Sequence, residues 1–198
     1  MADASRPLNI LALGDSLTEG YRLPASASYP SLIQAWLWRD GVNARVANHG
    51  VNGDTCADAL RRLEPILQEP WDIAVVGLGL NDVWEGFSLE RLRRDLSEIL
   101  ARLNEAGARL LLLEMRMPLP WPGAFMPAEG PQAFQALYPE LARAAGAALH
   151  QDFMGPALDH GLVQEDGAHP TAAGMEAIAK SLYPAVTAMV DAYFDNQF

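Results

Sequence analysis

The sequence has a single cysteine and a single lysine among its 198 residues. Cys56 alone excludes a disulfide within the chain and a metal site built from several cysteines, and we expect it to be a small buried or half-buried hydrophobic residue. Lys180 does not follow a glycine-rich loop, which excludes the P-loop class of nucleotide-binding proteins. No lysine is available in a predicted cleft, where Schiff-base chemistry would need one.

Positive charge and long apolar runs are also scarce. The formal net charge is −11, whereas affinity for nucleic acid depends on clustered lysine and arginine, so we expect no nucleic-acid partner. No stretch approaches the roughly 20 apolar residues that cross a bilayer, and the N-terminus lacks the basic and apolar regions of a signal peptide. We therefore expect a soluble chain with no integral membrane segment. Its compartment stays open: cytoplasmic, or bacterial periplasmic or secreted if an export signal was trimmed.

Half of the residues are hydrophobic, which is enough for one sizeable core in a chain of this length. No internal repeat and no linker divides the sequence. We therefore expect one domain over residues 1–198, with about 191–198 as a loose C-terminal tail. The oligomeric state stays open.

Short apolar segments alternate with segments of helical periodicity. The predicted strands are mainly aliphatic runs that stop at glycine or polar residues: 9–13, 44–48, 73–78, 109–114 and 148–153. The predicted helices repeat apolar residues on one face: 28–40, 54–67, 88–106, 132–145 and 171–192. Ser28 is a candidate N-cap for the first helix, and Thr55 or Asp54 for the second. This alternation predicts an α/β fold, a three-layer α/β/α sandwich around a five-stranded parallel sheet of flavodoxin-like order 2-1-3-4-5.

Ser16 follows the first predicted strand, just after Gly14 and Asp15. In open α/β sheets, ligands bind in the crevice beyond the carboxyl ends of the strands. A hydroxyl group at that place is a candidate nucleophile if a base can reach it. The alternative is a strand-to-helix turn in which Ser16 only caps the next helix.

Four further polar or turn residues follow other predicted strands or precede the last helix: Gly53, Asn81, Asp166 and His169. A serine hydroxyl becomes a good nucleophile when a neutral imidazole takes its proton, and a carboxylate fixes the tautomer of that imidazole. Asp166 and His169, three residues apart on a turn, can supply this pair. The backbone N–H groups of Ser16 and Gly53 and the side-chain amide of Asn81 suit the stabilisation of an oxyanion.

The spacing of these segments resembles a known family. Residues 14–17 (Gly-Asp-Ser-Leu), 48–55, 79–82 (Gly-Leu-Asn-Asp) and 166–170 (Asp-Gly-Ala-His-Pro) are similar to the first, second, third and fifth blocks of the GDSL, or SGNH, hydrolases. Residues 20–22 and the small-residue segment after them are closest to the bacterial thioesterase I subgroup, which includes arylesterases, acyl thioesterases and lysophospholipases.

The resemblance implies a role for each matched residue. Ser16 would be the nucleophile, His169 the base and Asp166 its orienting partner, while Ser16, Gly53 and Asn81 would form the oxyanion hole. It further implies a serine esterase that needs no cofactor and no metal. Its small-molecule substrates would be acyl or aryl esters, with acyl thioesters and lysophospholipids as further candidates, hydrolysed through an acyl-enzyme.

Two departures from the family pattern concern the substrate. Residues 115–131 form a long predicted loop that is rich in proline, and Leu80 fills a position where glycine is common. Loops of this length are often functional, although aromatic and methionine side chains fill cores equally well. The candidate substrate-binding residues are Leu17, Leu80, Trp84, Trp121, Phe125 and Met126.

A rival hypothesis uses the same sheet for other chemistry. Asp15, Asp54 and Asp82 follow strand ends and could hold Mg²⁺ in a metal-dependent phosphohydrolase or phospho-acceptor domain. The alternative for these aspartates is that each ties its turn together through backbone N–H groups. The rival leaves Asn81 and His169 without a role. A non-enzymatic interaction module that uses the proline-rich loop is a third possibility.

Overall fold

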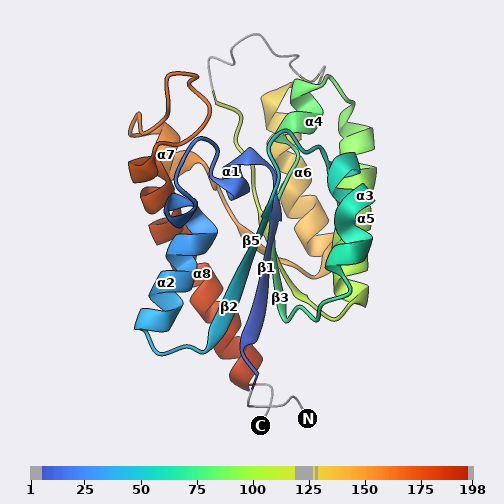
Figure 1. Cartoon of the computed structure of the whole chain (residues 1–198). Coiled ribbons are helices and arrows are strands. Elements are labelled where there is room, and N and C mark those ends of the chain that lie inside the picture. The colour runs from blue at the N-terminus through green and yellow to red at the C-terminus, as the bar shows by residue number, and fades with distance from the viewer. Residues whose placement is uncertain (1–5, 119–126, 128, 196–198) are drawn as a thin grey trace.

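The computed structural model describes residues 6–118, 127 and 129–195. In this part of the chain, five strands form one parallel sheet of order β2-β1-β3-β4-β5, as predicted (Figure 1). The strands are β1 (Leu8–Gly14), β2 (Ala44–Gly50), β3 (Ile73–Gly77), β4 (Arg109–Leu113) and β5 (Ala148–His150). The flavodoxin-like order puts β1 beside β3, so the chain changes direction across the sheet at this point.

Helices cover both faces of the sheet, which confirms the three-layer sandwich (Figure 1). One face carries α2 (Tyr29–Arg39) and α8 (Ala172–Asp195), which pack against each other. The other face carries α3 (Cys56–Ile66), α5 (Leu89–Glu105) and α6 (Gly130–Ala145). Every residue of β1 and of β3 is buried, as expected for strands that are covered on both sides.

Short helices lie at the carboxyl ends of the strands and were not predicted (Figure 1). They are α1 (Ser16–Glu19), η1 (Ala25–Ala27), α4 (Leu80–Trp84) and α7 (Gly155–Leu158). A helix of one turn has too few residues to show an apolar periodicity. Two of them matter for the site, because α1 begins at Ser16 and α4 contains Asn81.

Several boundaries differ from the predictions. β5 ends at His150 rather than near Phe153, whose buried ring belongs to the loop before α7. α8 continues to Asp195, whereas a loose segment was expected from about residue 191. Ser28 is the N-cap residue of α2, but its hydroxyl donates to the Ala25 carbonyl and does not cap the helix. The predicted cap at Thr55 is confirmed, since its hydroxyl accepts from the backbone of the first turn of α3.

Three strands end in glycine at the same level of the sheet. Gly14 of β1 pairs with Gly50 of β2 and with Gly77 of β3. A Cβ atom on Gly14 would overlap the side chain of Thr18, and one on Gly50 would overlap the backbone of Glu19. The absence of side chains therefore lets α1 lie directly on the strand ends.

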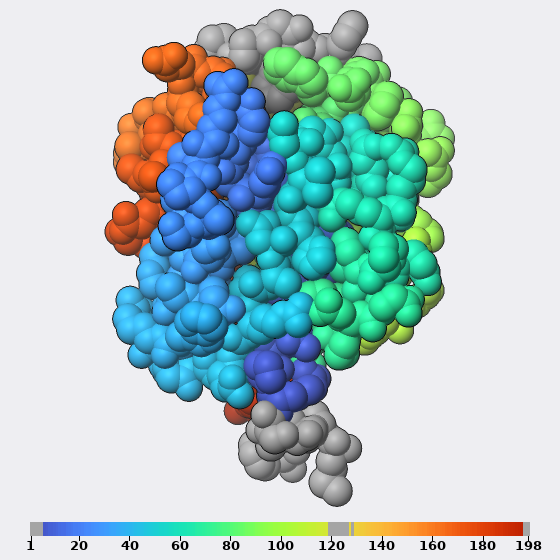
Figure 2. Space-filling model, viewed as in Figure 1, coloured from blue at the N-terminus to red at the C-terminus, as the bar shows by residue number. Residues whose placement is uncertain are grey.

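The N-terminal and C-terminal parts of the chain meet beside this helix. In Figure 2, the blue segment that follows α1 lies against the orange segment that precedes α8.

Cys56 is completely buried, as predicted. Among the described residues, no helix combines the length and apolarity needed to cross a membrane.

Candidate active site

Ser16 is the first residue of α1, directly beyond the carboxyl end of β1. Asp15 is the N-cap residue, and its Oδ1 accepts a hydrogen bond from the Leu17 N–H group at 2.9 Å. This bond fixes the start of the helix, because a helix leaves its first N–H groups without intrahelical partners. Ser16 is 6% exposed, so its hydroxyl lies at the floor of the site and not on the open surface.

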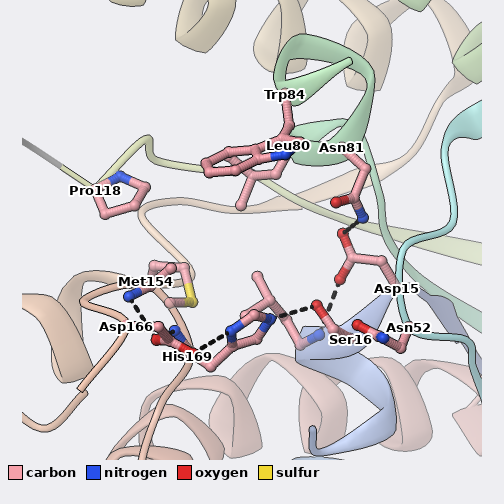
Figure 3. A pocket seen from close by; sticks show the side chains of 12 residues that line it. Asp15, Ser16, Asn52, Leu80, Asn81, Trp84, Pro118, Met154, Asp166 and His169 are labelled. Carbon is pink, nitrogen blue, oxygen red and sulfur yellow. Dashed lines mark hydrogen bonds and ion pairs between the residues drawn. The ribbon is translucent and has the colours of Figure 1, made fainter. Parts of the chain in front are cut away.

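Ser16, His169 and Asp166 form a continuous hydrogen-bonded chain (Figure 3). Ser16 Oγ lies 2.9 Å from His169 Nε2, and His169 Nδ1 lies 2.9 Å from Asp166 Oδ2. The other carboxylate oxygen, Asp166 Oδ1, accepts from the N–H groups of Ala168 and His169. With Nδ1–H donating to Asp166, Nε2 is free to accept the hydroxyl proton of Ser16.

The surroundings of Asp166 favour its ionised form. Burial by itself raises the pKa of this carboxyl group, but the hydrogen bonds from the backbone of His169 and Ala168 and from the imidazole have a larger combined effect. The pKa of Asp166 therefore lies below its ordinary value. An ionised carboxylate is the form that accepts a proton-donating Nδ1 and stabilises an imidazolium.

Asn81 lies in the same site, with its side-chain nitrogen held between two acceptors. Asn81 Nδ2 donates to the Asp54 carbonyl at 3.0 Å and lies 3.4 Å from Asp15 Oδ2. Gly53 belongs to the turn between β2 and α3, with a φ of +84° that an L side chain rarely adopts. The structure thus brings Ser16, Asn81, Asp166 and His169 into one pocket. Gly53 is not among the residues that line this pocket, although its chain neighbour Asn52 is.

The pocket is a cavity of about 290 Å³ with an apolar side. Leu17, Leu80 and Trp84 line it, where substrate-binding residues were expected. Trp121, Phe125 and Met126 lie outside the described residues. Sequence reasoning missed four lining residues: Asn52, Pro118, Met154 and Ala168. Figure 3 labels the first three.

The sequence could have identified some of these residues as pocket residues and not others. Asn52 lies inside the segment that resembles the second family block, so it could have been found there. Met154 is 1% exposed and lies between β5 and α7. A buried methionine fills a core as readily as a ligand pocket, so no sequence signal separates the two.

Arg62 of α3 joins the ends of two strands to the turn of Gly53. Its Nη2 group donates to the carbonyl of Gly14 at 3.0 Å and to that of His49 at 2.9 Å. Its Nε group lies 2.6 Å from Asp54 Oδ2. These contacts fix the chain two residues before Ser16 and immediately after Gly53, and sequence reasoning did not identify them.

With this geometry established, the comparison with known proteins decides the family. Residues 12–177 match the sequence model of the GDSL-like Lipase/Acylhydrolase family. The chain belongs to this family. The resemblance found in the four sequence blocks is therefore confirmed.

The relatives of this GDSL-family chain include several named esterases. It is 35% identical over 185 residues to Thioesterase 1/protease 1/lysophospholipase L1 of Escherichia coli (strain K12), covering 89% of this chain and 84% of the relative. It is 30% identical over 167 residues to an arylesterase of Vibrio mimicus, covering 81% and 79%. The crystal structure of AlinE4, an SGNH-hydrolase family esterase, matches with a TM-score of 0.73 and 36% identity, covering 93% of this chain and 97% of that chain.

Membership of the GDSL family does not favour the rival metal-dependent phosphohydrolase. Asp15 and Asp82 accept hydrogen bonds from backbone N–H groups, as the structural alternative predicted, whereas the partner of Asp54 is the Arg62 side chain. Within the described ranges, no three histidine, cysteine, aspartate or glutamate side chains are grouped to hold a metal ion.

Two of these aspartates have strongly altered acidities. Burial raises the pKa of Asp15 to about 7, although the hydrogen bond from Leu17 N–H opposes this shift. Burial likewise raises the pKa of Asp82 to about 6, opposed by the hydrogen bond from the Cys56 N–H group. Both carboxyl groups are buried. Asp15 lines the pocket and lies 3.4 Å from Asn81 Nδ2, whereas Asp82 joins α4 to the first residue of α3.

Proposed function

We propose that this chain is a serine ester hydrolase that works through a covalent acyl-enzyme, with Ser16, His169 and Asp166 as its catalytic residues. The observation that carries the proposal is the unbroken chain of two 2.9 Å contacts from Ser16 Oγ through the imidazole to Asp166. It lies beside a partly apolar pocket in a member of a lipase and acylhydrolase family.

The proposed reaction has two stages. Ser16 Oγ attacks the carbonyl carbon of the ester while His169 Nε2 takes the hydroxyl proton. The tetrahedral intermediate collapses, and the alcohol or thiol leaves with that proton. A water molecule then attacks the acyl-enzyme with His169 again as the base, which releases a carboxylic acid and restores Ser16.

The negative oxygen of each intermediate needs fixed hydrogen-bond donors. We assign this role to the N–H groups of Ser16 and Gly53 and to the Nδ2 group of Asn81. In the structure, Asn81 Nδ2 has one contact of 3.0 Å and one of 3.4 Å. The longer contact, to Asp15 Oδ2, is the weaker one. The oxyanion would replace it while the Asp54 carbonyl continues to hold the amide.

The proposed substrates are acyl or aryl esters, with acyl thioesters and lysophospholipids as further candidates. Two observations support this choice. The relatives are named arylesterase and thioesterase 1/lysophospholipase L1. Leu17, Leu80, Trp84 and Met154 give the pocket an apolar side next to Ser16, which suits a hydrocarbon or aromatic group.

The test is hydrolysis of p-nitrophenyl esters of increasing acyl length, followed by an acyl-CoA and a lysophospholipid. Ser16→Ala is expected to abolish nearly all turnover, while Ser97→Ala, at an exposed serine of α5, is a matched control that retains it. Undiminished activity of Ser16→Ala would overturn the proposal. Loss of the wild-type activity with EDTA would instead revive the metal-dependent rival.

A further inference from the structure

Ser16 and His169 are 153 positions apart in the chain, yet their side chains meet at hydrogen-bond distance. Neither side chain can set this distance alone, because Ser16 begins α1 and His169 lies in the separate segment before α8. The segments that carry them are joined by Tyr21 and Gln164, which we call the Tyr21–Gln164 clip. Neither residue is among those that line the pocket.

Tyr21 contacts both partners of the proposed proton transfer. Its N–H group donates to the Ser16 carbonyl at 3.1 Å. Its ring lies against the imidazole of His169, with 4.4 Å between ring centroids and an angle of 40° between the planes. Tyr21 thus extends the turn that begins at Ser16 and packs against the imidazole ring of His169.

Gln164 completes the connection from the other segment. Its Nε2 group donates to the Tyr21 carbonyl at 3.0 Å and to the Pro170 carbonyl at 2.9 Å, so both amide hydrogens are used. Its own backbone N–H group donates to the His169 carbonyl at 2.7 Å. These bonds hold the carbonyl groups of His169 and of the next residue, Pro170, against the segment that follows Ser16.

The backbone beside the clip is in a strained conformation. Arg22 has a φ of +58°, in the left-handed region that residues other than glycine rarely adopt. Strain of this kind persists where surrounding contacts determine the backbone, and it gathers at functional sites. Here the contacts are those of Tyr21, the preceding residue, with Ser16, His169 and Gln164.

We infer that Tyr21 and Gln164 are positioning residues, which hold the His169 ring at bonding distance from Ser16 Oγ. This inference rests on the proposed function. The clip acts through His169 and does not touch the substrate, so its loss should lower kcat and leave KM almost unchanged. Misplacement of a catalytic group by about 1 Å can cost on the order of 100-fold in rate.

The experiment compares two variants of the clip with two matched controls. Gln164→Ala removes both side-chain bonds, and Glu165→Ala truncates the exposed neighbouring residue. Tyr21→Leu removes the aromatic ring, whereas Tyr21→Phe keeps it. Steady-state kinetics with p-nitrophenyl butyrate, the rate of Ser16 labelling by a fluorophosphonate, and the melting temperature are measured for each.

The inference predicts that Gln164→Ala and Tyr21→Leu lower kcat by about 10- to 100-fold, with a parallel fall in the labelling rate. KM should change less than about twofold, and Glu165→Ala and Tyr21→Phe should behave like the wild type. Rescue by Tyr21→Phe separates ring support from a general loss of folding. If Gln164→Ala does not fold, the two Tyr21 variants decide the question.

Three outcomes would overturn the inference. In the first, both clip variants match the controls in kcat. In the second, Tyr21→Phe is as impaired as Tyr21→Leu. In the third, the fall in kcat only follows the loss of folded protein. A wild type and a Glu165→Ala variant that hydrolyse no ester would instead remove the proposed function, and the inference with it.

Discussion

The side-chain amide of Asn81 donates to the backbone carbonyl of Asp54, 27 positions earlier in the chain. This bond joins α4 to the turn that contains Gly53, so two of the three proposed oxyanion donors come from segments that are bonded to each other. The orientation of the amide is thereby fixed before any substrate binds, which is the condition for effective stabilisation of a developing charge.

Removal of this amide should reduce turnover. Asn81→Ala is expected to lower kcat by about 100- to 1,000-fold, as is typical for the loss of one oxyanion donor. KM should change little, because the donor acts mainly in the transition state. Steady-state kinetics with one p-nitrophenyl ester will measure this. Asn104→Ala, at an exposed asparagine that bonds to the end of α6, is the control, and equal kcat values for the two variants would contradict the assignment.

Asp82 should make the folded state less stable as the pH rises. Its pKa is raised from 3.8 to about 6, so the folded state binds the proton more tightly than the unfolded state. The free energy of unfolding therefore decreases between about pH 4 and pH 6, by up to about 3 kcal/mol.

Asp82→Asn removes this ionisation and keeps an oxygen that can accept from the Cys56 N–H group. Urea denaturation at pH 5 and pH 8 should give a smaller difference for this variant than for the wild type, with a gain in stability at pH 8. Asp191→Asn changes an exposed aspartate of α8 and should leave the difference unaltered. A variant that is less stable than the wild type at pH 8 would refute the prediction.

Met154 should influence the choice of acyl chain. Met154→Ala enlarges the pocket, so we expect kcat/KM for short esters to fall and the preference to move toward longer chains. One methylene group is worth about 1 to 3 kcal/mol in such a pocket. Met175→Ala, at a methionine buried elsewhere in the core, should destabilise the fold without changing the chain-length preference. The same preference in both variants would exclude Met154 as a substrate contact.

Arg62 should contribute to stability at the carboxyl ends of the strands. Arg62→Gln removes bonds to the carbonyls of Gly14 and His49 and the ion pair with Asp54, and we expect a loss of about 1 to 3 kcal/mol in the free energy of unfolding. The neighbouring Arg61 is 72% exposed and pairs only with Asp58 among the described ion pairs. Arg61→Gln should therefore cost less than about 1 kcal/mol. Equal losses in urea denaturation would contradict the difference.

The sequence predicts the alternating strands and helices that make up the layers of the fold. Aliphatic runs predicted β1, β3 and β4 because covered parallel strands need apolar residues on both faces, whereas the edge strands β2 and β5 are more exposed and were predicted from shorter apolar segments. The order of the strands followed from the flavodoxin-like fold that this alternation predicts. The positions of Ser16, Asn81 and His169 in the sequence predict that they meet at one edge of the sheet, and all three line one pocket there. Chemistry at strand ends is thus predictable when several segments supply complementary groups.

Contacts that depend on three-dimensional detail were not predictable. Arg62 lies in a helix where an arginine usually faces solvent, and its spacing does not reveal that strand-end carbonyls are within reach. Gln164 has no charge and no periodicity to mark it, although it bonds to Tyr21 across the chain. Asp54 resembles Asp15 and Asp82 in sequence position, yet only the fold decides that its partner is an arginine side chain.

The strand-end glycines have a consequence for attempts to alter this enzyme. Because α1 rests on Gly14 and Gly50 without intervening side chains, a Cβ atom at either position would collide with this helix, and at Gly14 it would also lie 2.7 Å from the Gly77 carbonyl oxygen in the sheet. At Gly50 the nearest atoms all belong to the backbone of Thr18 and Glu19, so an added methyl group would push α1 away from the sheet and move Ser16 relative to His169. Gly50 variants are therefore expected to be folded but inactive, whereas Gly14 variants should also lose stability, and libraries designed to broaden the substrate range should leave both codons fixed.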